Sequence, residues 1–111
     1  MQSLPPGANV FGILPGTLWG TSRDRLVIIG AHWDTMDKTD GYNDNGSGVA
    51  AVLEVARQIV ESHCRPKNTI IFATFDLEEM GGQVINFLLR WALYYKHEKT
   101  KAEKIHEKII S

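Results

Sequence analysis

Two uninterrupted apolar runs, one on each side of an amphipathic segment, constrain the fold of this chain more than any other feature. The first run is RLVIIGA (25–31) and the second is NTIIFATF (68–75), and both are rich in β-branched residues. Strands without alternating polar side chains are typical of a sheet that is covered on both faces, as in parallel α/β sheets. The sequence therefore predicts two buried strands of a mostly parallel sheet.

The segment GSGVAAVLEVARQIVESHC (46–64), which separates the two runs, has the period of an amphipathic helix. Its apolar residues recur at intervals of three and four, and its charged residues fall on the opposite side. These apolar residues are Val49, Val52, Leu53, Ala56, Ile59 and Val60. Asn45 or Ser47 is suited to cap the start of the helix, and Pro66 is expected to end it. The order strand, helix, strand predicts a crossover that leaves the two strands parallel.

The residues outside this unit suggest how the rest of the chain is organised. Residues 1–8 are a Pro- and Gly-rich lead-in, and the β-prone run NVFGIL (9–14) is closed by the turn signal PGT. A further helix is predicted from Val84, and it continues into a Lys- and Glu-rich end. We therefore predict a lead-in, an α/β domain over residues 9–83 and a divergent helical tail over residues 84–111. The α/β domain is expected to have three layers, with helices flanking the sheet.

Composition limits the partners and compartments that fit this chain. The net charge of −1 gives no electrostatic basis for binding nucleic acid or an anionic membrane. No run reaches the ~20 apolar residues of a membrane span, and the first residues lack the features of a signal peptide. Cys64 is the only cysteine, so no internal disulfide can form. We expect a small soluble domain with no nucleic-acid or membrane partner, whose oligomeric state and localisation are left open.

Two acidic loops follow the two predicted strands. HWDTMDKTDGYNDNGSG (32–48) comes after the first strand, and DLEEMGG (76–82) comes after the second. Since sites in α/β sheets form at the carboxyl ends of parallel strands, we expect both loops to converge on one edge of the sheet. The side chains that would meet there are His32, Asp34, Asp44, Glu78 and Glu79.

One imidazole among several carboxylates is a set of ligands that suits Zn²⁺ and similar ions. Asp34, two residues after His32, is placed to accept the second ring N–H, which is how metal-bound histidines are usually oriented. Glu78 and Glu79 are adjacent in a loop and point in different directions, so one can bind a metal while the other takes a proton from water. A carboxylate such as Asp44 can bridge two ions about 3.5–4 Å apart.

The stretches VIIGAHWDT, GYNDNGSGVAAVLEVAR and IIFATFDLEEMG, in this order, resemble the co-catalytic di-zinc exopeptidase family. Its members include bacterial leucyl aminopeptidases, aminopeptidase Y and glutamate carboxypeptidase. The resemblance covers about residues 9–83 and implies part of the catalytic domain of a zinc-dependent metalloprotease. The implied reaction is hydrolysis of a terminal peptide bond of a peptide substrate by a metal-bound hydroxide. Whether the enzyme is an aminopeptidase or a carboxypeptidase stays open.

The resemblance also implies a role for each of the five residues. His32 corresponds to a ligand of one zinc ion, and Asp34 to the neighbour that orients it. Asp44 corresponds to the carboxylate that bridges both zinc ions. Glu78 corresponds to the general base, and Glu79 to a ligand of the other zinc ion.

The chain departs from the family pattern after residue 83. The family has two further ligands, but no Asp follows Asp76, and His97 and His106 lie in the Lys-rich end. We therefore expect an internal slice of the catalytic domain, such as a truncated or alternatively spliced product, with weakened metal binding and little turnover. The alternatives are a binding-only module of the same fold and a dinucleotide-binding domain. In the latter, GSGVAA (46–51) would form the Gly-rich turn and Asp76 would bind the ribose.

Overall fold

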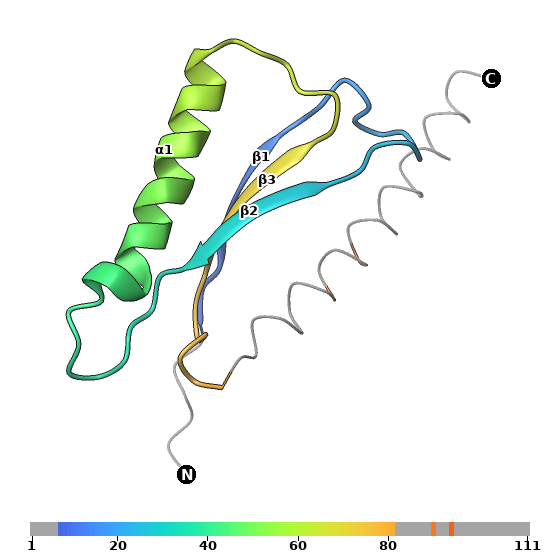
Figure 1. Cartoon of the computed structure of the whole chain (residues 1–111). Coiled ribbons are helices and arrows are strands. Elements are labelled where there is room, and N and C mark those ends of the chain that lie inside the picture. Colours follow the sequence, from blue (N-terminus) through green and yellow to red (C-terminus); the bar gives the residue numbers. More distant parts are fainter. Residues whose placement is uncertain (1–6, 82–89, 91–93, 95–111) are drawn as a thin grey trace.

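The computed structural model describes residues 7–81, 90 and 94 of the chain, which form three strands and one long helix (Figure 1). The elements are β1 (Val10–Leu14), β2 (Val27–His32), a π-helical turn η1 (Tyr42–Gly46), α1 (Ser47–Glu61) and β3 (Ile70–Phe75). Of the helix predicted from Val84, only Arg90 and Tyr94 are described, and the rest lies outside the described residues. Among the described residues, no helix has the length and apolar composition that crossing a membrane requires.

The strands form one sheet in the order β1-β3-β2. β2 and β3 are parallel neighbours, which confirms the crossover predicted from the sequence. β1 pairs with the other side of β3 and runs antiparallel to it. The described sheet is therefore mixed rather than mostly parallel, within an α/β arrangement. The sequence could not give the direction of β1, because no single crossover connects β1 to β3 and restricts how they pair.

The core lies around the central strand β3. Its side chains alternate, with Ile71, Ala73 and Phe75 buried and the residues between them half-buried. The ring of Phe11 packs edge-on against Phe75, with 6.2 Å between the ring centroids. In β2, by contrast, Val27 is 44% exposed. Among the described residues only α1 covers the sheet, so coverage of β2 on both faces stays a prediction.

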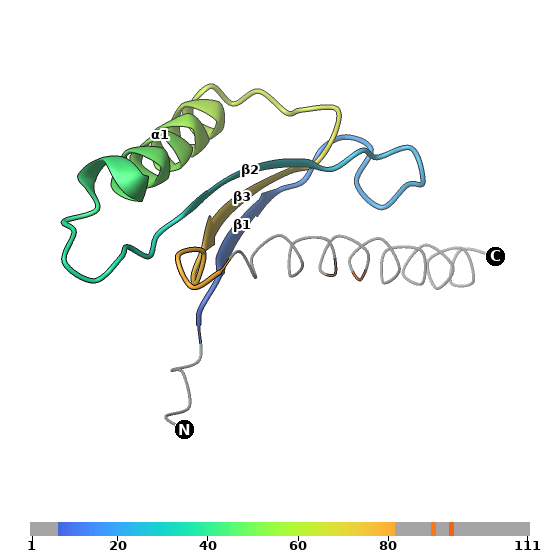
Figure 2. The ribbon, with the colours of Figure 1, turned by 60° about the horizontal axis from the view of Figure 1, so that its bottom comes forward.

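Helix α1 lies over one face of the sheet and packs against β2 and β3 (Figure 2). Val52, on its apolar side, is buried against this face, whereas Leu53 and Val60 are exposed. The apolar stripe predicted from the sequence is thus wider than the part of the helix that the three strands cover. The periodicity identified the helix correctly but overestimated how much of it is buried.

The ends of α1 are set by local hydrogen bonds. The cap position at the start of the helix is occupied by Gly46 rather than by Asn45 or Ser47. The Asn45 side chain nevertheless accepts the N–H of Gly48 at 3.0 Å, and the Ser47 hydroxyl donates to the carbonyl of Asn43. The helix ends at Glu61, before Pro66 is reached. The reason is His63, which adopts the left-handed conformation (φ 54°) that commonly closes a helix.

A buried hydrogen-bond network joins the start of β3 to the loop before β2. Thr69 is fully buried, and its hydroxyl donates to the Asp24 carboxylate at 2.7 Å while accepting the N–H of Gly16 at 3.2 Å. The N–H of Thr69 donates to the same carboxylate at 2.9 Å. These bonds hold the amino ends of the two parallel strands together, and the ladder between β2 and β3 keeps the strands side by side up to His32 and Phe75 at their carboxyl ends.

Candidate metal centre

The two acidic loops meet at the carboxyl ends of β2 and β3. His32 and Phe75 are the last residues of their strands and are partners in the register. The N–H of Trp33 still donates to the carbonyl of Phe75 at 2.7 Å, so the strands stay paired up to the point where the loops begin. Beyond it, the N–H of Glu79 donates to the Asp34 carboxylate at 3.0 Å. The two loops are therefore joined directly.

Both ring nitrogens of His32 face oxygen atoms. Nδ1 lies 3.1 Å from the backbone carbonyl oxygen of Asp34 and 3.3 Å from its carboxylate. Nε2 lies 3.0 Å from the Asp44 carboxylate and 3.8 Å from that of Glu78. If Nδ1 carries the hydrogen and donates to Asp34, Nε2 is directed at two carboxylates.

This arrangement favours positive charge at Nε2. An unprotonated Nε2 would direct its lone pair at the Asp44 carboxylate, which is unfavourable unless a proton or a metal ion lies between them. Burial acts to lower the pKa of His32, but the hydrogen bond to the Asp34 carbonyl and the negative charges of Glu78 and Asp34 outweigh it. The net effect raises the pKa of His32 above its usual value of 6.5. One nitrogen and several carboxylate oxygens around this point fit a zinc ion.

Three side chains bring their ligand atoms close enough to share one ion. One ligand atom from each of His32, Glu78 and Glu79 lies within 4.8 Å of the other two. Asp44 contacts His32 but is not a member of this group, and its side chain is 75% exposed on η1. The structure thus groups Glu78 with the ligands, although the resemblance implies that it is the base. The roles of Asp44, Glu78 and Glu79 stay predictions.

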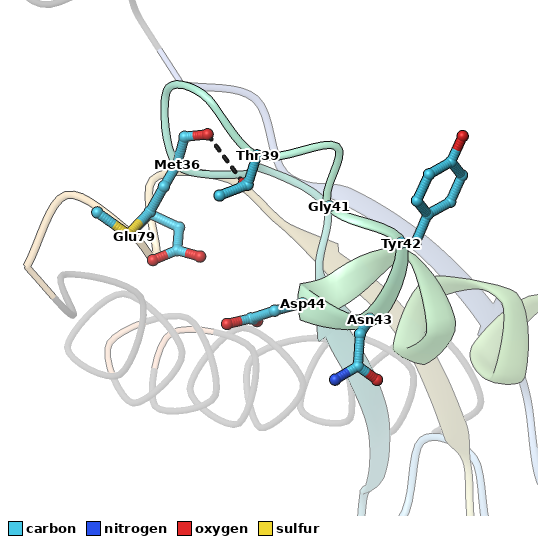
Figure 3. Close-up of a pocket in the computed structure, with 7 residues that line it drawn as sticks. All are labelled: Met36, Thr39, Gly41, Tyr42, Asn43, Asp44 and Glu79. Atoms are coloured by element: carbon cyan, nitrogen blue, oxygen red, sulfur yellow. Dashed lines mark hydrogen bonds between the residues drawn. The ribbon is translucent and has the colours of Figure 1, made fainter.

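A pocket of about 260 Å³ opens beside this cluster (Figure 3). It is lined by Met36, Thr39, Gly41, Tyr42, Asn43, Asp44 and Glu79. Figure 3 shows the carboxylates of Asp44 and Glu79 pointing toward the same space from different loops. The Thr39 hydroxyl donates to the carbonyl of Met36 at 3.0 Å and closes the turn on one side of the pocket. A ligand in this pocket would lie next to the carboxylates of Asp44 and Glu79.

The pocket depends on a glycine. Gly41 has a φ of 64°, in the left-handed region, and η1 begins directly after it. A side chain at this position would also collide with the methyl group of Thr35. Only glycine fits both requirements.

The sequence did not reveal that residues before β1 help to hold the two acidic loops in place. The Asp76 carboxylate accepts the N–H groups of Ala8 and Leu77, and the Trp33 indole donates to the carbonyl of Ala8. The ribose-binding role that a dinucleotide-binding domain would give Asp76 competes with these bonds for the same carboxylate. No local signal could have identified the contact, because Ala8 and Asp76 are 68 positions apart.

Comparisons with known proteins identify relatives of this chain. The family model of Peptidase family M28 matches residues 9–106. A probable lipoprotein aminopeptidase of Mycobacterium tuberculosis is 44% identical over 69 residues, which are 62% of this chain and 13% of that protein. Aminopeptidase Y of Saccharomyces cerevisiae is 36% identical over 80 residues, 72% of this chain and 13% of the yeast protein. A probable glutamate carboxypeptidase of Zea mays is 38% identical over 76 residues, 66% of this chain and 10% of the plant protein.

The chain thus spans about a tenth to an eighth of the length of these three relatives. No solved structure matches it. The family match begins at residue 9, directly before β1, and extends past residue 83. It includes both acidic loops and the strands and helix that position them.

Proposed function

This chain belongs to Peptidase family M28, and on that premise we propose that it supplies part of the zinc centre of a metallo-exopeptidase acting on terminal peptide bonds. The observation that carries the proposal is the grouping of His32, Glu78 and Glu79 at the carboxyl ends of two parallel strands. The names of the matched relatives, which are aminopeptidases and a carboxypeptidase, support the same reaction class. In the whole domain, we propose that a second helical layer covers the face of the sheet opposite α1.

We propose that His32, Asp44 and Glu79 hold the metal, with two zinc ions in the complete site. Bound zinc supplies Lewis acidity and lowers the pKa of a coordinated water. The contribution of Asp34 is to hold Nδ1 of His32, so that Nε2 stays directed at the site. The second carboxylate oxygen of Asp34 accepts the N–H of Glu79, which keeps the two proposed ligands at a constant separation.

We propose that Glu78 is the general base. Its carboxylate lies 3.8 Å from Nε2 of His32 and is partly open to solvent, so it can reach both the cluster and a water molecule. In the proposed reaction Glu78 takes the proton from the attacking water and later gives it to the nitrogen of the leaving amine. The pocket beside Asp44 and Glu79 provides space for the substrate residue next to the scissile bond.

Zinc titration by calorimetry tests the metal centre. We expect the wild-type chain to bind zinc and the Asp44→Ala variant to bind it more weakly, because a carboxylate facing Nε2 is lost. Asp37→Ala is the matched control, since it removes an exposed carboxylate from the same loop. Equal heats for wild type and Asp44→Ala would refute the assignment.

Turnover is a separate question, because this chain has only part of the ligand set that the family resemblance implies. We expect little or no hydrolysis of an aminoacyl-nitroanilide by the 111-residue chain. Activity that Glu78→Gln abolishes would contradict this expectation and would establish Glu78 as the base. Activity that persists in Glu78→Gln would instead indicate a contaminating peptidase.

A further inference from the structure

The pairing of β1 with β3 ends at Val10 and Thr74, two residues before the second acidic loop begins at Asp76. The antiparallel register, continued past Val10, places Ala8 opposite Asp76. At this position, hydrogen bonds from backbone N–H groups to side chains take the place of the next backbone–backbone hydrogen bonds of the ladder. The Asn9 side-chain oxygen accepts the N–H of Asp76 at 2.8 Å, and the Asp76 carboxylate accepts the N–H of Ala8 at 3.0 Å. The β1–β3 pairing therefore ends in a clamp formed by the side chains of Asn9 and Asp76 and the backbone N–H of Ala8.

The chain reverses immediately after this clamp. Leu77 has a φ of 63°, which is uncommon for a residue with a bulky side chain. The second carboxylate oxygen of Asp76 accepts the N–H of Leu77 at 2.9 Å. The Leu77 side chain lies against Gly7, where an added Cβ would come within 2.6 Å of it. The unusual conformation is thus held by the clamp on one side and by packing on the other.

The reversal decides where the two glutamates lie. An extended chain would carry them away from β3 by about 3.3 Å per residue. Instead, the N–H of Glu79 reaches the Asp34 carboxylate, and the N–H of Gly81 donates to the carbonyl of Glu78 at 3.3 Å. The acidic loop consequently folds back over the end of β2, where His32 lies.

We propose that Asp76 is a positioning residue of the metal centre. It ends the β1–β3 pairing and holds Leu77 in the left-handed conformation, so that Glu78 and Glu79 face His32. An ordinary turn aspartate bonds only to backbone groups close to it in sequence, whereas Asp76 also binds Ala8, which is 68 positions away. The inference rests on the proposed function only for its statement about metal binding.

The first test uses the metal-free chain and the Asp76→Asn variant. Asparagine keeps the shape but places an NH₂ donor at one of two positions that now accept N–H groups. Because one oxygen remains to accept, we expect the amide of either Ala8 or Leu77 to exchange with solvent roughly tenfold faster, as the loss of a hydrogen bond implies, and the amide of Glu79 to exchange faster because the loop is held less firmly. Asp37→Asn, the same chemical change at an exposed site, should leave them unchanged. Unchanged exchange at Glu79 in Asp76→Asn would overturn the proposal.

The second test measures zinc affinity by calorimetry. We expect Asp76→Asn to weaken it about 10- to 100-fold, the usual effect of removing a group that orients a ligand. A second substitution, Leu77→Gly, should restore most of the loss, because glycine adopts the left-handed conformation without support. The contrary result is a loss of zinc affinity that Leu77→Gly does not restore, together with unchanged amide exchange in Asp76→Asn. It would mean that Asp76 acts on the ion through its charge, against the proposal.

The two tests separate this inference from the proposed function. If the wild-type chain binds no zinc, the metal centre is refuted, but amide exchange still decides whether Asp76 positions the loop. If Asp76→Asn does not fold, Asn9→Ala replaces it, because it removes the acceptor of the Asp76 N–H and leaves the carboxylate intact. Faster exchange at Leu77 in Asn9→Ala is then the expected result, and wild-type exchange is the contrary one.

Discussion

Replacing Asp34 with asparagine tests the electrostatics of the metal centre, because it exchanges one carboxylate oxygen for an NH₂ group and removes the negative charge. The carboxylate has two partners: one oxygen lies 3.3 Å from Nδ1 of His32, and the other accepts the N–H of Glu79 at 3.0 Å. Asparagine has the same shape, but it offers one acceptor oxygen and one NH₂ donor. In Asp34→Asn, one of the two partners therefore loses its acceptor, and the negative charge beside His32 is removed.

The structure sets the size of the expected effect. The Asp34 side chain is only 14% exposed, so water replaces the lost acceptor poorly. A hydrogen bond to a charged group contributes about 1.5–3 kcal/mol, and about 1.4 kcal/mol corresponds to a tenfold change in a binding constant. We therefore expect the zinc Kd of Asp34→Asn to rise about 10- to 100-fold, in the range typical of groups that orient a metal ligand.

The metal-free chain gives an independent measurement, which is the titration of the His32 imidazole by NMR. Burial acts to lower the pKa of His32 and is outweighed by the Asp34 carbonyl, by Glu78, and by the side chain of Asp34 through its hydrogen bond and charge. Asp34→Asn removes the charge, so the pKa of His32 should fall below that of wild type.

The sign of the pH dependence of stability follows from the same shift. Because the folded chain raises the pKa of His32, its stabilising effect is complete below pH 6.5 and is lost as the pH rises through the folded pKa. Wild-type stability should therefore decline from about pH 6.5 upward, and less so in Asp34→Asn. Asp40→Asn, in the exposed part of the loop, is the control. An unchanged His32 titration together with an unchanged zinc Kd in Asp34→Asn would refute the electrostatic account.

Three further substitutions test other parts of the structure. Thr69→Val should lower the free energy of unfolding in urea by about 1.5–3 kcal/mol, because the Asp24 carboxylate loses a buried hydroxyl donor; a change near zero would contradict the buried network. Gly41→Ala should lower thermal stability by at least about 1–2 kcal/mol, since its φ is 64°; wild-type melting would show that the loop tolerates a side chain. Glu54 has its pKa lowered to about 2 by hydrogen bonds from Arg57 and Gln58, so its stabilising effect on α1 is complete above pH 4.5 and is lost as the pH falls toward 2. Circular dichroism should show a loss of helix over this range in wild type that is absent in Glu54→Gln. The loss should be small, because the ion pair of Glu54 and Arg57 is exposed; identical curves for the two proteins would contradict the stabilising effect of Glu54.

The periodicity of the sequence was sufficient to locate α1 and β3 and to predict that β2 and β3 are parallel. It succeeded because side-chain periodicity and the topology of a crossover are properties of continuous segments. The same reasoning placed both acidic loops at one edge of the sheet, which is why the sequence alone identifies His32 and the two glutamates as neighbours. Their roles at the metal come from family resemblance and await the zinc titrations.

The antiparallel direction of β1, the exposure of β2, the pocket beside Asp44 and the reversal at Leu77 could not be predicted from the sequence. Each of these features depends on contacts between segments that are far apart along the chain. The contact of Ala8 with Asp76 is the clearest case, because hydrophobic periodicity carries no information about a side chain that accepts a distant backbone N–H. The residue types of the candidate site can thus be read from the sequence, whereas their orientation arises only when residues 7–9 come together with β2 and β3.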